Sequence, residues 1–396
     1  MLIVRAVAVV ALVGGAAAAQ TITLEGGPAG TPPTPMHMTV GHPLVHPDAV
    51  RLVGRTAGAT VLGKYEWLSG GITVWFIAPK LGPGEKLTLT LEPGSRVMDL
   101  DMAKGVRIKE EDGGHTVRIN GDVFMRYVTT DTSKPYCYPV IGPTGVGVTR
   151  GWPMVTDIAG EANDHVHHQS LWFGFGDVNG HDFWATAADK CRIVPSGPVS
   201  FETGLVFASL KASNAWTAQD GTVICTDTRT IRVYDVDGIR MMDYEVTIHA
   251  SEGPAVFGDT KEGMMSLRLC PELTVDNGAA TIVNSQSDKN GDAWGKRARW
   301  CDDYGTLGGD TVGVAILDAP TNLRHPTYWH VRTYGLFGAN PFGVRDFTSD
   351  PASDGSLTIP AGGEQTFKYR IVIHKGTPEE AGIEQLWQAY ARDMTQ

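Results

Sequence analysis

The densest group of side chains able to ligate, titrate or stack lies in residues 163–184, NDHVHHQSLWFGFGDVNGHDFW. In an extended chain His165 and His167 point to the same side and His168 to the other. Two imidazoles at this spacing could bind one divalent metal ion, with Asp182 as the third ligand. The same imidazoles could instead exchange protons with a substrate, or make structural hydrogen bonds in a polar loop.

The second half of this segment indicates a tight turn. Gly176, Asp177, Asn179 and Gly180 are typical turn residues, and aromatic residues flank them on both sides. Asp177 and Asn179 would then be presented beside aromatic faces, an arrangement suited to sugar hydroxyls. Trp184, among polar residues, is the candidate for stacking on a pyranose, whereas Trp172 is expected in the core.

A charged pair, Lys261 and Glu262, precedes a strand-like run that begins at Met264 in FGDTKEGMMSLRL. On a solvated rim the pair would have no chemical role. Turned into a cleft, Glu262 would be the best general base in the chain, because desolvation raises the pKa of a carboxylate toward neutrality. Lys261 would keep this carboxylate ionised or bind a substrate oxygen.

Three further segments carry candidate substrate-binding or catalytic groups. WGKRARWCDDYG contains Arg299, which could bind hydroxyls or carboxylates. HPTYWHVRTYGLFGANPFG contains His330, a candidate acid that faces the same way as Arg332 on a strand, and Asn340 in a turn. The proline-rich segment KPYCYPVIGPTGVGVTRGWPM presents Tyr138 and Arg150 or, alternatively, covers a sheet edge.

Strands must position these side chains, because the chain is rich in short β-like runs and glycine turns. Residues 115–128 join two runs through Asn-Gly, the strongest short hairpin signal, and residues 365–375 alternate with a period of two. A capping box at Thr377, Pro378 and Glu380 begins an amphipathic helix over residues 378–393. The pattern predicts an all-β fold, a large antiparallel β-sandwich, over residues 106–396 with this helix at its C-terminus.

The N-terminal hundred residues divide into three parts. Residues 1–19 have one arginine, an apolar run and a final Ala-Ala-Ala, which indicates a secretory signal peptide and a periplasmic or secreted protein. Residues 20–36 are rich in Gly, Pro and Thr and are expected to be an exposed linker. Residues 37–105 predict a small β region, and no later segment is apolar enough to span a membrane.

Composition and missing motifs narrow the possible functions. The formal net charge of −11 argues against a nucleic-acid partner. The five cysteines form no Cys-x-x-Cys pair, and we interpret them as buried, inert thiols. The sequence also lacks a Gly-x-Ser-x-Gly elbow, a P-loop, a His-Glu-x-x-His motif and a dinucleotide fingerprint.

The segments KPYCYPVIGPTGVGVTRGWPM, DHVHHQSLWFGFGDVNGHDFW and DTKEGMMSLRL resemble a family of exported bacterial proteins labelled methane oxygenase PmoA-like, a domain of unknown function. The resemblance covers about residues 106–374. The membrane-bound oxygenase subunit behind that label is multi-helical, whereas this chain has no span after its signal peptide. Association of such proteins with sugar catabolism implies carbohydrate chemistry. The β pattern also resembles the galactose mutarotase-like supersandwich, in which histidine and a carboxylate act on a pyranose.

The main hypothesis is an exported carbohydrate-active enzyme that uses general acid–base chemistry as a hydrolase, lyase or epimerase. Glu262 is the expected base, and His165, His167 or His330 the expected acid. A metal-dependent version of this chemistry, a non-catalytic glycan-binding protein and, least favoured, a copper oxygenase are the alternatives. A divalent metal is the only cofactor that the residues suggest, and the sequence does not specify an oligomeric state.

Overall fold

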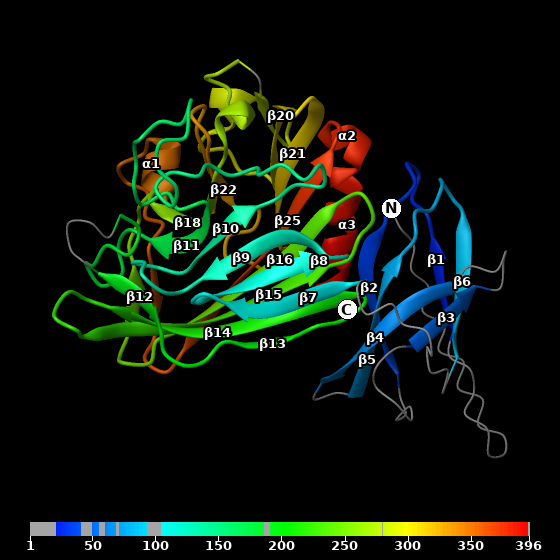
Figure 1. The fold of residues 1–396 in the computed structure, drawn as a ribbon. Helices are drawn as coiled ribbons and strands as arrows, with labels where there is room; N and C mark the ends of the chain where they lie inside the picture. Colours follow the sequence, from blue (N-terminus) through cyan, green and yellow to red (C-terminus); the bar gives the residue numbers. More distant parts are fainter. Residues whose placement is uncertain are drawn as a thin grey trace.

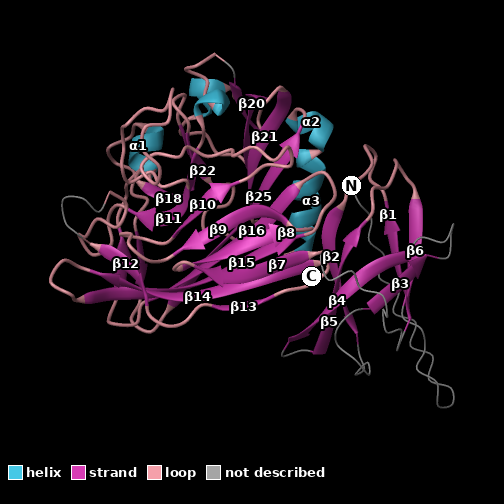
Figure 2. Cartoon of the chain, in the orientation of Figure 1, coloured by secondary structure: helices cyan, strands magenta, loops and turns pink. Residues whose placement is uncertain are grey.

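The computed structural model describes residues 21–40, 50–54, 60–68, 71–92, 104–185, 191–278 and 280–394. The predicted signal peptide lies outside these residues. Three large antiparallel sheets account for most of the fold, and the helices are few and short (Figures 1 and 2). The predicted all-β fold class is therefore confirmed. No helix in the described ranges is both long enough and apolar enough to cross a bilayer.

The first sheet of the main body has eight strands. In spatial order these are β22 (Tyr328–Val331), β23 (Leu336–Asn340), β18 (Gly263–Arg268), β11 (Leu171–Phe175), β10 (Tyr136–Val140), β9 (Asp122–Val128), β8 (Gly114–Ile119) and β7 (Val106–Glu111). The predicted Asn-Gly hairpin joins β8 to β9, and Asn120 and Gly121 have φ angles of 53° and 93°. A two-residue loop with both φ angles positive matches the twist of the strands it joins.

The second sheet has nine strands and packs against the first. Its order is β12 (Arg192–Pro195), β14 (Phe207–Thr217), β15 (Val223–Tyr234), β16 (Arg240–His249), β25 (Glu364–Lys375), β21 (Asp310–Asp318), β20 (Trp300–Leu307) and β19 (Ala280–Asn284), with β13 (Ser200–Glu202) paired to β14. The largest hydrophobic core lies between the two sheets. A two-stranded sheet, β17 (Ala255–Phe257) with β24 (Leu357–Ile359), adds to its edge.

The N-terminal region forms a separate six-stranded sheet (Figure 1). Its order is β1 (Thr21–Glu25), β6 (Lys86–Glu92), β3 (Val50–Gly54), β4 (Thr60–Leu68), β5 (Gly71–Ala78) and β2 (Thr34–Val40). The expectation of an exposed linker over residues 20–36 is wrong, since β1 and the start of β2 lie there. Ile22 and Leu24 alternate with threonines and bury themselves in this sheet's own core, a signal that the surrounding Gly and Pro obscured.

The helices are α1 (Val344–Thr348), α2 (Pro378–Ala381) and α3 (Ile383–Asp393), together with the 3-10 turns η1 (Pro271–Leu273) and η2 (Asn290–Ala293). The predicted C-terminal helix is interrupted at Gly382, whose φ of 70° ends α2 and begins α3. The capping box at Thr377 is present. Ile383, Leu386 and Tyr390 cover the outer face of the nine-stranded sheet, beside Trp75 of the N-terminal sheet.

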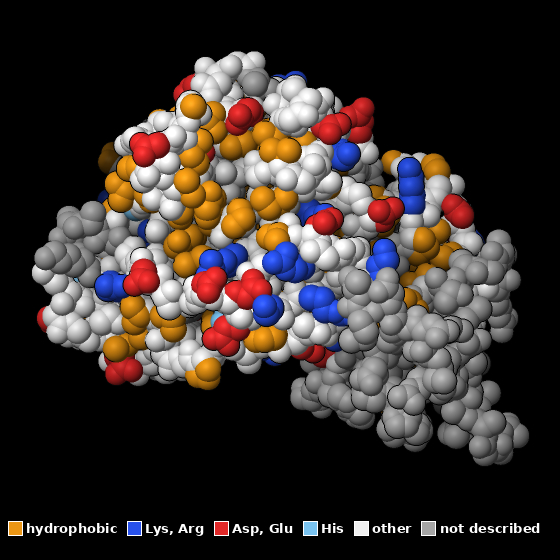
Figure 3. All heavy atoms as spheres, in the orientation of Figure 1, with side chains coloured by type: hydrophobic (Ala, Val, Ile, Leu, Met, Phe, Trp, Pro, Cys, Tyr) orange, Lys and Arg blue, Asp and Glu red, His pale blue; other side chains and the backbone are white. Residues whose placement is uncertain are grey.

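All five cysteines are buried and unpaired, as the sequence predicted. Burial raises the pKa of the Cys137 and Cys270 thiols to about 12, which makes them unreactive as nucleophiles. The surface shown in Figure 3 mixes acidic and basic side chains. Lys109 and Glu111 on β7 form one such pair, at 2.9 Å.

Candidate functional site

A row of four residues crosses the eight-stranded sheet and forms the floor of the candidate site. Trp172 on β11 is opposite Ser266 on β18, Ser266 is opposite Gly338 on β23, and Gly338 is opposite His330 on β22. Directly opposed residues of antiparallel strands share a face of the sheet. Their neighbours Phe173, Met265 and Phe337 face the main core, so the row faces away from it.

A cleft of about 350 Å³ lies on this side of the sheet, and His330 is the member of the row that lines it. Its lining comes from the histidine-rich segment, the start of β18, and β22 with β23. The lining residues are His165, His167, His168, Asp182, Trp184, Ala185, Lys261, Glu262, His330, Arg332, Tyr334 and Leu336. The structure therefore brings together segments that are up to 170 positions apart in the sequence.

Four rings are stacked along one wall of the cleft. Tyr334 stacks on His165 with centroids 5.4 Å apart, His165 on His168 at 4.7 Å, and His168 on Trp172 at 5.2 Å. The expectation of an extended His-x-His pair is wrong here: His165 has a φ of 42° and its carbonyl accepts a hydrogen bond from the His168 amide. This turn places the imidazoles in a stack instead of aiming two of them at one point.

Asp164, next to the histidine turn, forms ion pairs with two arginines. Arg150 donates to its carboxylate, and Arg268 does so at 3.1 Å. The guanidiniums and the neighbouring His165 hold the pKa of Asp164 down at about 2, against the opposing effect of burial. Arg268 also donates to His168 Nδ1 at 3.3 Å, so that this nitrogen carries a lone pair.

Three histidines of the cleft, His167, His168 and His330, are neutral at pH 7. Burial, followed by the charge of Lys134, lowers the pKa of His167 to about 4. Burial, followed by the charge of Arg332, lowers that of His330 to about 3. Burial and His167 lower the pKa of His168 further still. A histidine with so low a pKa is almost entirely deprotonated at neutral pH and is a poor general acid. We therefore assign His167 and His330 the role of neutral hydrogen-bonding groups in place of the expected role of an acid.

Lys261 and Glu262 lie at the mouth of the cleft. The Lys261 ammonium is 3.3 Å from Glu262 Oε1 and 4.0 Å from Asp346 Oδ2 on α1. The Glu262 side chain is 38% exposed, so it is not desolvated as the sequence analysis required of a base with a raised pKa. The ammonium is thus a partner of opposite charge for the Glu262 carboxylate.

The floor contains buried polar atoms that have no partner in the described structure. They are Trp172 Nε1, Trp184 Nε1, Ser266 Oγ and His330 Nδ1. Buried polar groups are nearly always hydrogen-bonded, because an unsatisfied one costs about 1–3 kcal/mol. Trp184 is only 1% exposed, so it forms the floor and is not a free face for stacking on a sugar.

Lys134 is fully buried beneath the cleft. Its ammonium donates to the Trp184 carbonyl at 2.8 Å and lies 6.0 Å from the centre of the Trp172 ring. Burial lowers the pKa of Lys134 to about 7. Lys134 therefore fixes the position of Trp184 and influences the charge state of the histidines above it.

The proposed metal ligands do not form a coordination group. Within the described ranges no three or more His, Cys, Asp or Glu side chains converge as a metal site would require. Asp182 Oδ1 instead accepts from the backbone amides of Trp184 and Ala185, at 2.7 and 2.9 Å. The set of His165, His167 and Asp182 is therefore not supported as a metal site.

Asp177 and Asn179 form the predicted turn but lie outside the cleft. Asn179 and Gly180 have φ angles of 52° and 81°, and Asp177 Oδ1 accepts from the Gly180 amide. The Asn179 amide donates to the Pro254 carbonyl and accepts from the Val256 amide, so both of its polar ends are occupied. The turn fastens this loop to β17 and presents no group to a ligand in the cleft.

Four other predicted substrate-binding residues are also absent from the cleft lining. Arg299 pairs with Glu384 of α3 at 3.1 Å, on the other sheet. Asn340 is buried and bridges the Thr260 carbonyl and the Phe342 amide. Arg150 is buried behind Asp164, and Tyr138 lies near Gly151 on the far side of that pair. Their roles are structural, whereas Lys261, Glu262, His330 and the histidine segment do meet.

The sequence analysis missed Ser266, Arg268, Lys134 and Tyr334. The spacing of two between Ser266 and Arg268 on β18 could have identified both residues. It places them on one face of the sheet, the face that also carries the candidate His330. Lys134 and Tyr334 gave no local signal. Both lie outside strands, and only the tertiary fold places them near the histidines.

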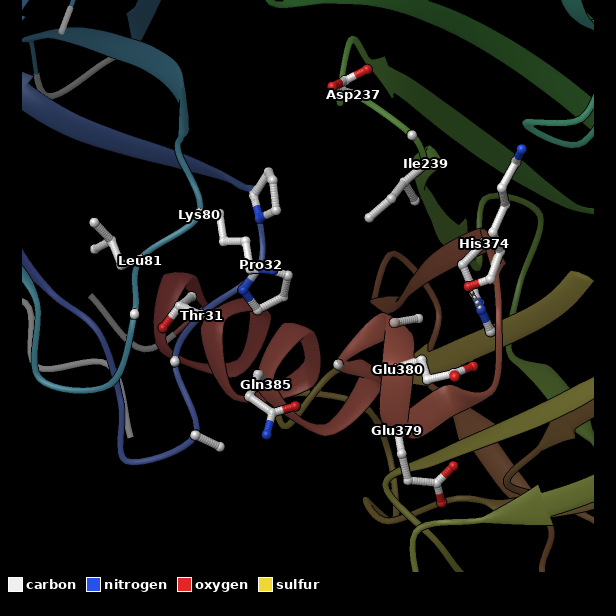
Figure 4. Close-up of a pocket in the computed structure, with 18 of the residues that line it drawn as sticks. Thr31, Pro32, Lys80, Leu81, Asp237, Ile239, His374, Glu379, Glu380 and Gln385 are labelled. Atoms are coloured by element: carbon white, nitrogen blue, oxygen red, sulfur yellow. Dashed lines mark hydrogen bonds between the residues drawn. The ribbon is translucent and has the colours of Figure 1, made fainter. Parts of the chain in front are cut away.

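Two other hollows carry none of the candidate catalytic residues. One of them, about 440 Å³, lies where Thr31, Pro32 and Leu81 of the N-terminal region approach α2 and α3 (Figure 4). Glu379, Glu380 and Gln385 border it from the helices (Figure 4). Glu380 is engaged in the capping box. This hollow is a junction between elements, and the histidine cleft remains the candidate active site.

The sequence matches the model of a family described as a family of unknown function (DUF6807) over residues 115–388. No curated protein matches it. A glycosyl hydrolase family 38 protein from Enterococcus faecalis is a structural neighbour with a TM-score of 0.40 and 11% identity, covering 95% of this chain and 46% of its own. An alpha-mannosidase from Enterococcus faecalis V583 has a TM-score of 0.38 and 11% identity, covering 95% and 45%. This chain thus spans under half of either enzyme's length.

Proposed function

The chain belongs to the DUF6807 family of unknown function, and we propose that it is an exported enzyme that acts on a sugar ring by general acid–base chemistry. One observation carries the proposal: a carboxylate, several imidazoles and unpartnered buried hydrogen-bonding atoms lie in or beside a single cleft. A polyhydroxylated ligand is the class of molecule that satisfies many donors and acceptors at once. The export part of the proposal rests on the signal-peptide pattern of residues 1–19.

Glu262 is the proton-transfer group in this proposal. Its carboxylate lies 3.3 Å from the Lys261 ammonium at the mouth of the cleft. No hydrogen bond from a described backbone amide reaches its oxygens. Asp182 is the other acidic residue that lines the cleft, and its Oδ1 accepts hydrogen bonds from two backbone amides. Glu262 can therefore take a proton from a sugar hydroxyl or carbon, with Lys261 stabilising the negative charge that develops on oxygen.

His330 lines the cleft and holds the ring in this proposal, with Ser266 buried behind it. The two residues share a face of the sheet on either side of Gly338, and the Ser266 hydroxyl occupies the space that a side chain at 338 would take. His330 Nδ1 and Ser266 Oγ are both without partners. Neutral imidazole and hydroxyl groups each donate and accept, which suits hydroxyl recognition without a charge penalty.

The test is a comparison of Glu262→Gln with the unchanged protein on a panel of oligosaccharides and keto-sugars, followed by NMR over time. Glu252→Gln, an exposed carboxylate elsewhere, is the matched control. We expect turnover by the unchanged protein and by the control, and a loss of about 10²-fold or more in Glu262→Gln. Equal turnover by all three would remove Glu262 from the mechanism, and saturable binding without turnover would make the protein a glycan-binding one.

A further inference from the structure

Arg332 is a cation of the cleft without a counter-ion. It lines the cleft, and its guanidinium makes no hydrogen bond or ion pair within the described part of the chain. Its Cζ lies 4.8 Å from the centre of the Trp294 ring, which supports the guanidinium from one side. A guanidinium held in this way keeps its fork of N–H donors available for an incoming group.

Most other charges near the cleft already have partners. Arg150 and Arg268 share Asp164, and Lys261 lies between Glu262 and Asp346. Asp182 is directed to backbone amides, and Lys134 is buried beneath the cleft, where it donates to the Trp184 carbonyl. His167 and His330 add no charge at neutral pH. The charge of Arg332 is thus left for a ligand to neutralise.

We infer that the sugar bound in this cleft carries a carboxylate, as a uronic acid does, and that Arg332 binds this carboxylate. The inference rests on the proposed function and names its substrate class. A planar carboxylate matches the guanidinium fork and can accept two parallel hydrogen bonds, which a sugar hydroxyl cannot. The net charge of −11 repels anions from the protein as a whole, so any preference for an acidic sugar must originate locally.

An acidic ligand would also change the charge balance above the floor. After burial, the charge of Arg332 is the largest cause that lowers the pKa of His330. A carboxylate on Arg332 would partly cancel that effect and bring the imidazole closer to protonation. Ligand binding and proton uptake at His330 would then be coupled, whereas a neutral sugar would not produce this coupling.

The experiment uses two ligand sets that differ only in the carboxylate. Oligouronides from polygalacturonate, alginate and glucuronan are compared with their carboxyl-reduced counterparts by calorimetry, on the full mature chain. The variants are Arg332→Gln, Arg332→Lys and, as a control of equal charge change, Arg345→Gln on α1, which is exposed and does not line the cleft.

We expect the unchanged protein and Arg345→Gln to bind at least one oligouronide about ten-fold more tightly than its reduced form. Arg332→Gln should lose this preference, and Arg332→Lys should recover part of it. Equal binding of both forms by the unchanged protein would overturn the inference. A preference for the acidic form that persists in Arg332→Gln would overturn it as well. Either result leaves the proposed function unaffected. Binding of neither form, nor of any neutral sugar, would overturn both. The comparison on the unchanged protein decides the matter even if a variant fails to fold.

Discussion

Ser266 and Gly338 are directly opposite each other on β18 and β23, and a methyl group on residue 338 would lie 2.3 Å from the Ser266 hydroxyl oxygen. This distance is far below van der Waals contact. Glycine at 338 therefore permits a serine in the floor of the cleft, and the pair sets the space between Trp172 and His330.

Gly338→Ala should push the Ser266 side chain out of its position and weaken ligand binding, by about ten-fold if one hydrogen bond is lost. The measurement is the affinity for whichever sugar the unchanged protein binds. Gly197→Ala, where an added methyl meets nothing within 4 Å, is the control and should have no effect. Unaltered affinity in Gly338→Ala would place the ligand away from this row.

Replacing Asp164 should disturb the whole histidine wall. Asp164→Asn leaves Arg150, only 2% exposed, without its carboxylate, but the Asp164 side chain is itself 39% exposed, so we expect a loss of about 1 kcal/mol. Thermal unfolding at pH 7 should report a lower midpoint. Because the pKa of Asp164 is lowered to about 2, its contribution to stability is present above pH 4 and fades as the pH falls toward 2. A difference between the two proteins that stays constant down to pH 2 would contradict this assignment.

The pKa of His167 should depend on Lys134. In the unchanged protein, NMR titration of the imidazole should give a pKa of about 4. Lys134→Met removes a cation and should raise that value, whereas Lys211→Met, at an exposed site on β14, should not. An unaltered His167 pKa in Lys134→Met would show that the charge of Lys134 does not contribute to it.

The same low pKa has a consequence for stability. The unfolded chain protonates this imidazole near pH 6.5 and the folded chain only near pH 4. The contribution of His167 to the free energy of unfolding should therefore decline as the pH falls from about 6.5 to 4. Comparison of His167→Gln with the unchanged protein by chemical unfolding at several pH values would measure it, and an equal pH dependence of both would exclude the effect.

Gly382→Ala should destabilise the C-terminal helix pair. Gly382 has a φ of 70°, and an added methyl would also lie 3.3 Å from Pro32 Cγ. The left-handed conformation alone costs a non-glycine residue about 1 kcal/mol. Gly291→Ala, where nothing lies within 4 Å, serves as the comparison in chemical unfolding. An equal effect of both substitutions would mean that the break between α2 and α3 needs no glycine.

Local signals predicted the elements well. The alternation in residues 364–375 became β25, Asn120-Gly121 became a hairpin, and the capping box at Thr377 is present. Each of these depends on neighbours in the sequence. The strand β1 was missed because the surrounding Gly and Pro obscured a short alternation.

The site was predictable only where candidates lay on adjacent strands. Glu262 and His330 do meet the histidine segment, since β11, β18, β23 and β22 are neighbours in one sheet. Arg299 does not, because β20 belongs to the other sheet, and a sequence pattern does not reveal which sheet a strand joins. Asp177 and Asn179 do not bind in the cleft as expected, because their side chains make hydrogen bonds to nearby backbone amides.

The edge strand β7 determines how far the chain can be shortened for expression. β7 pairs with β8 along its whole length, and the far end of α3 carries Asp393, which contacts His37 of β2 at 2.6 Å. A fragment of residues 115–388 would expose β8 as a bare edge able to recruit strands from other copies. It would also lack the N-terminal sheet and the end of α3 that contacts it. Aggregation of such a fragment would therefore reflect a missing boundary strand and say nothing about the intact protein's solubility.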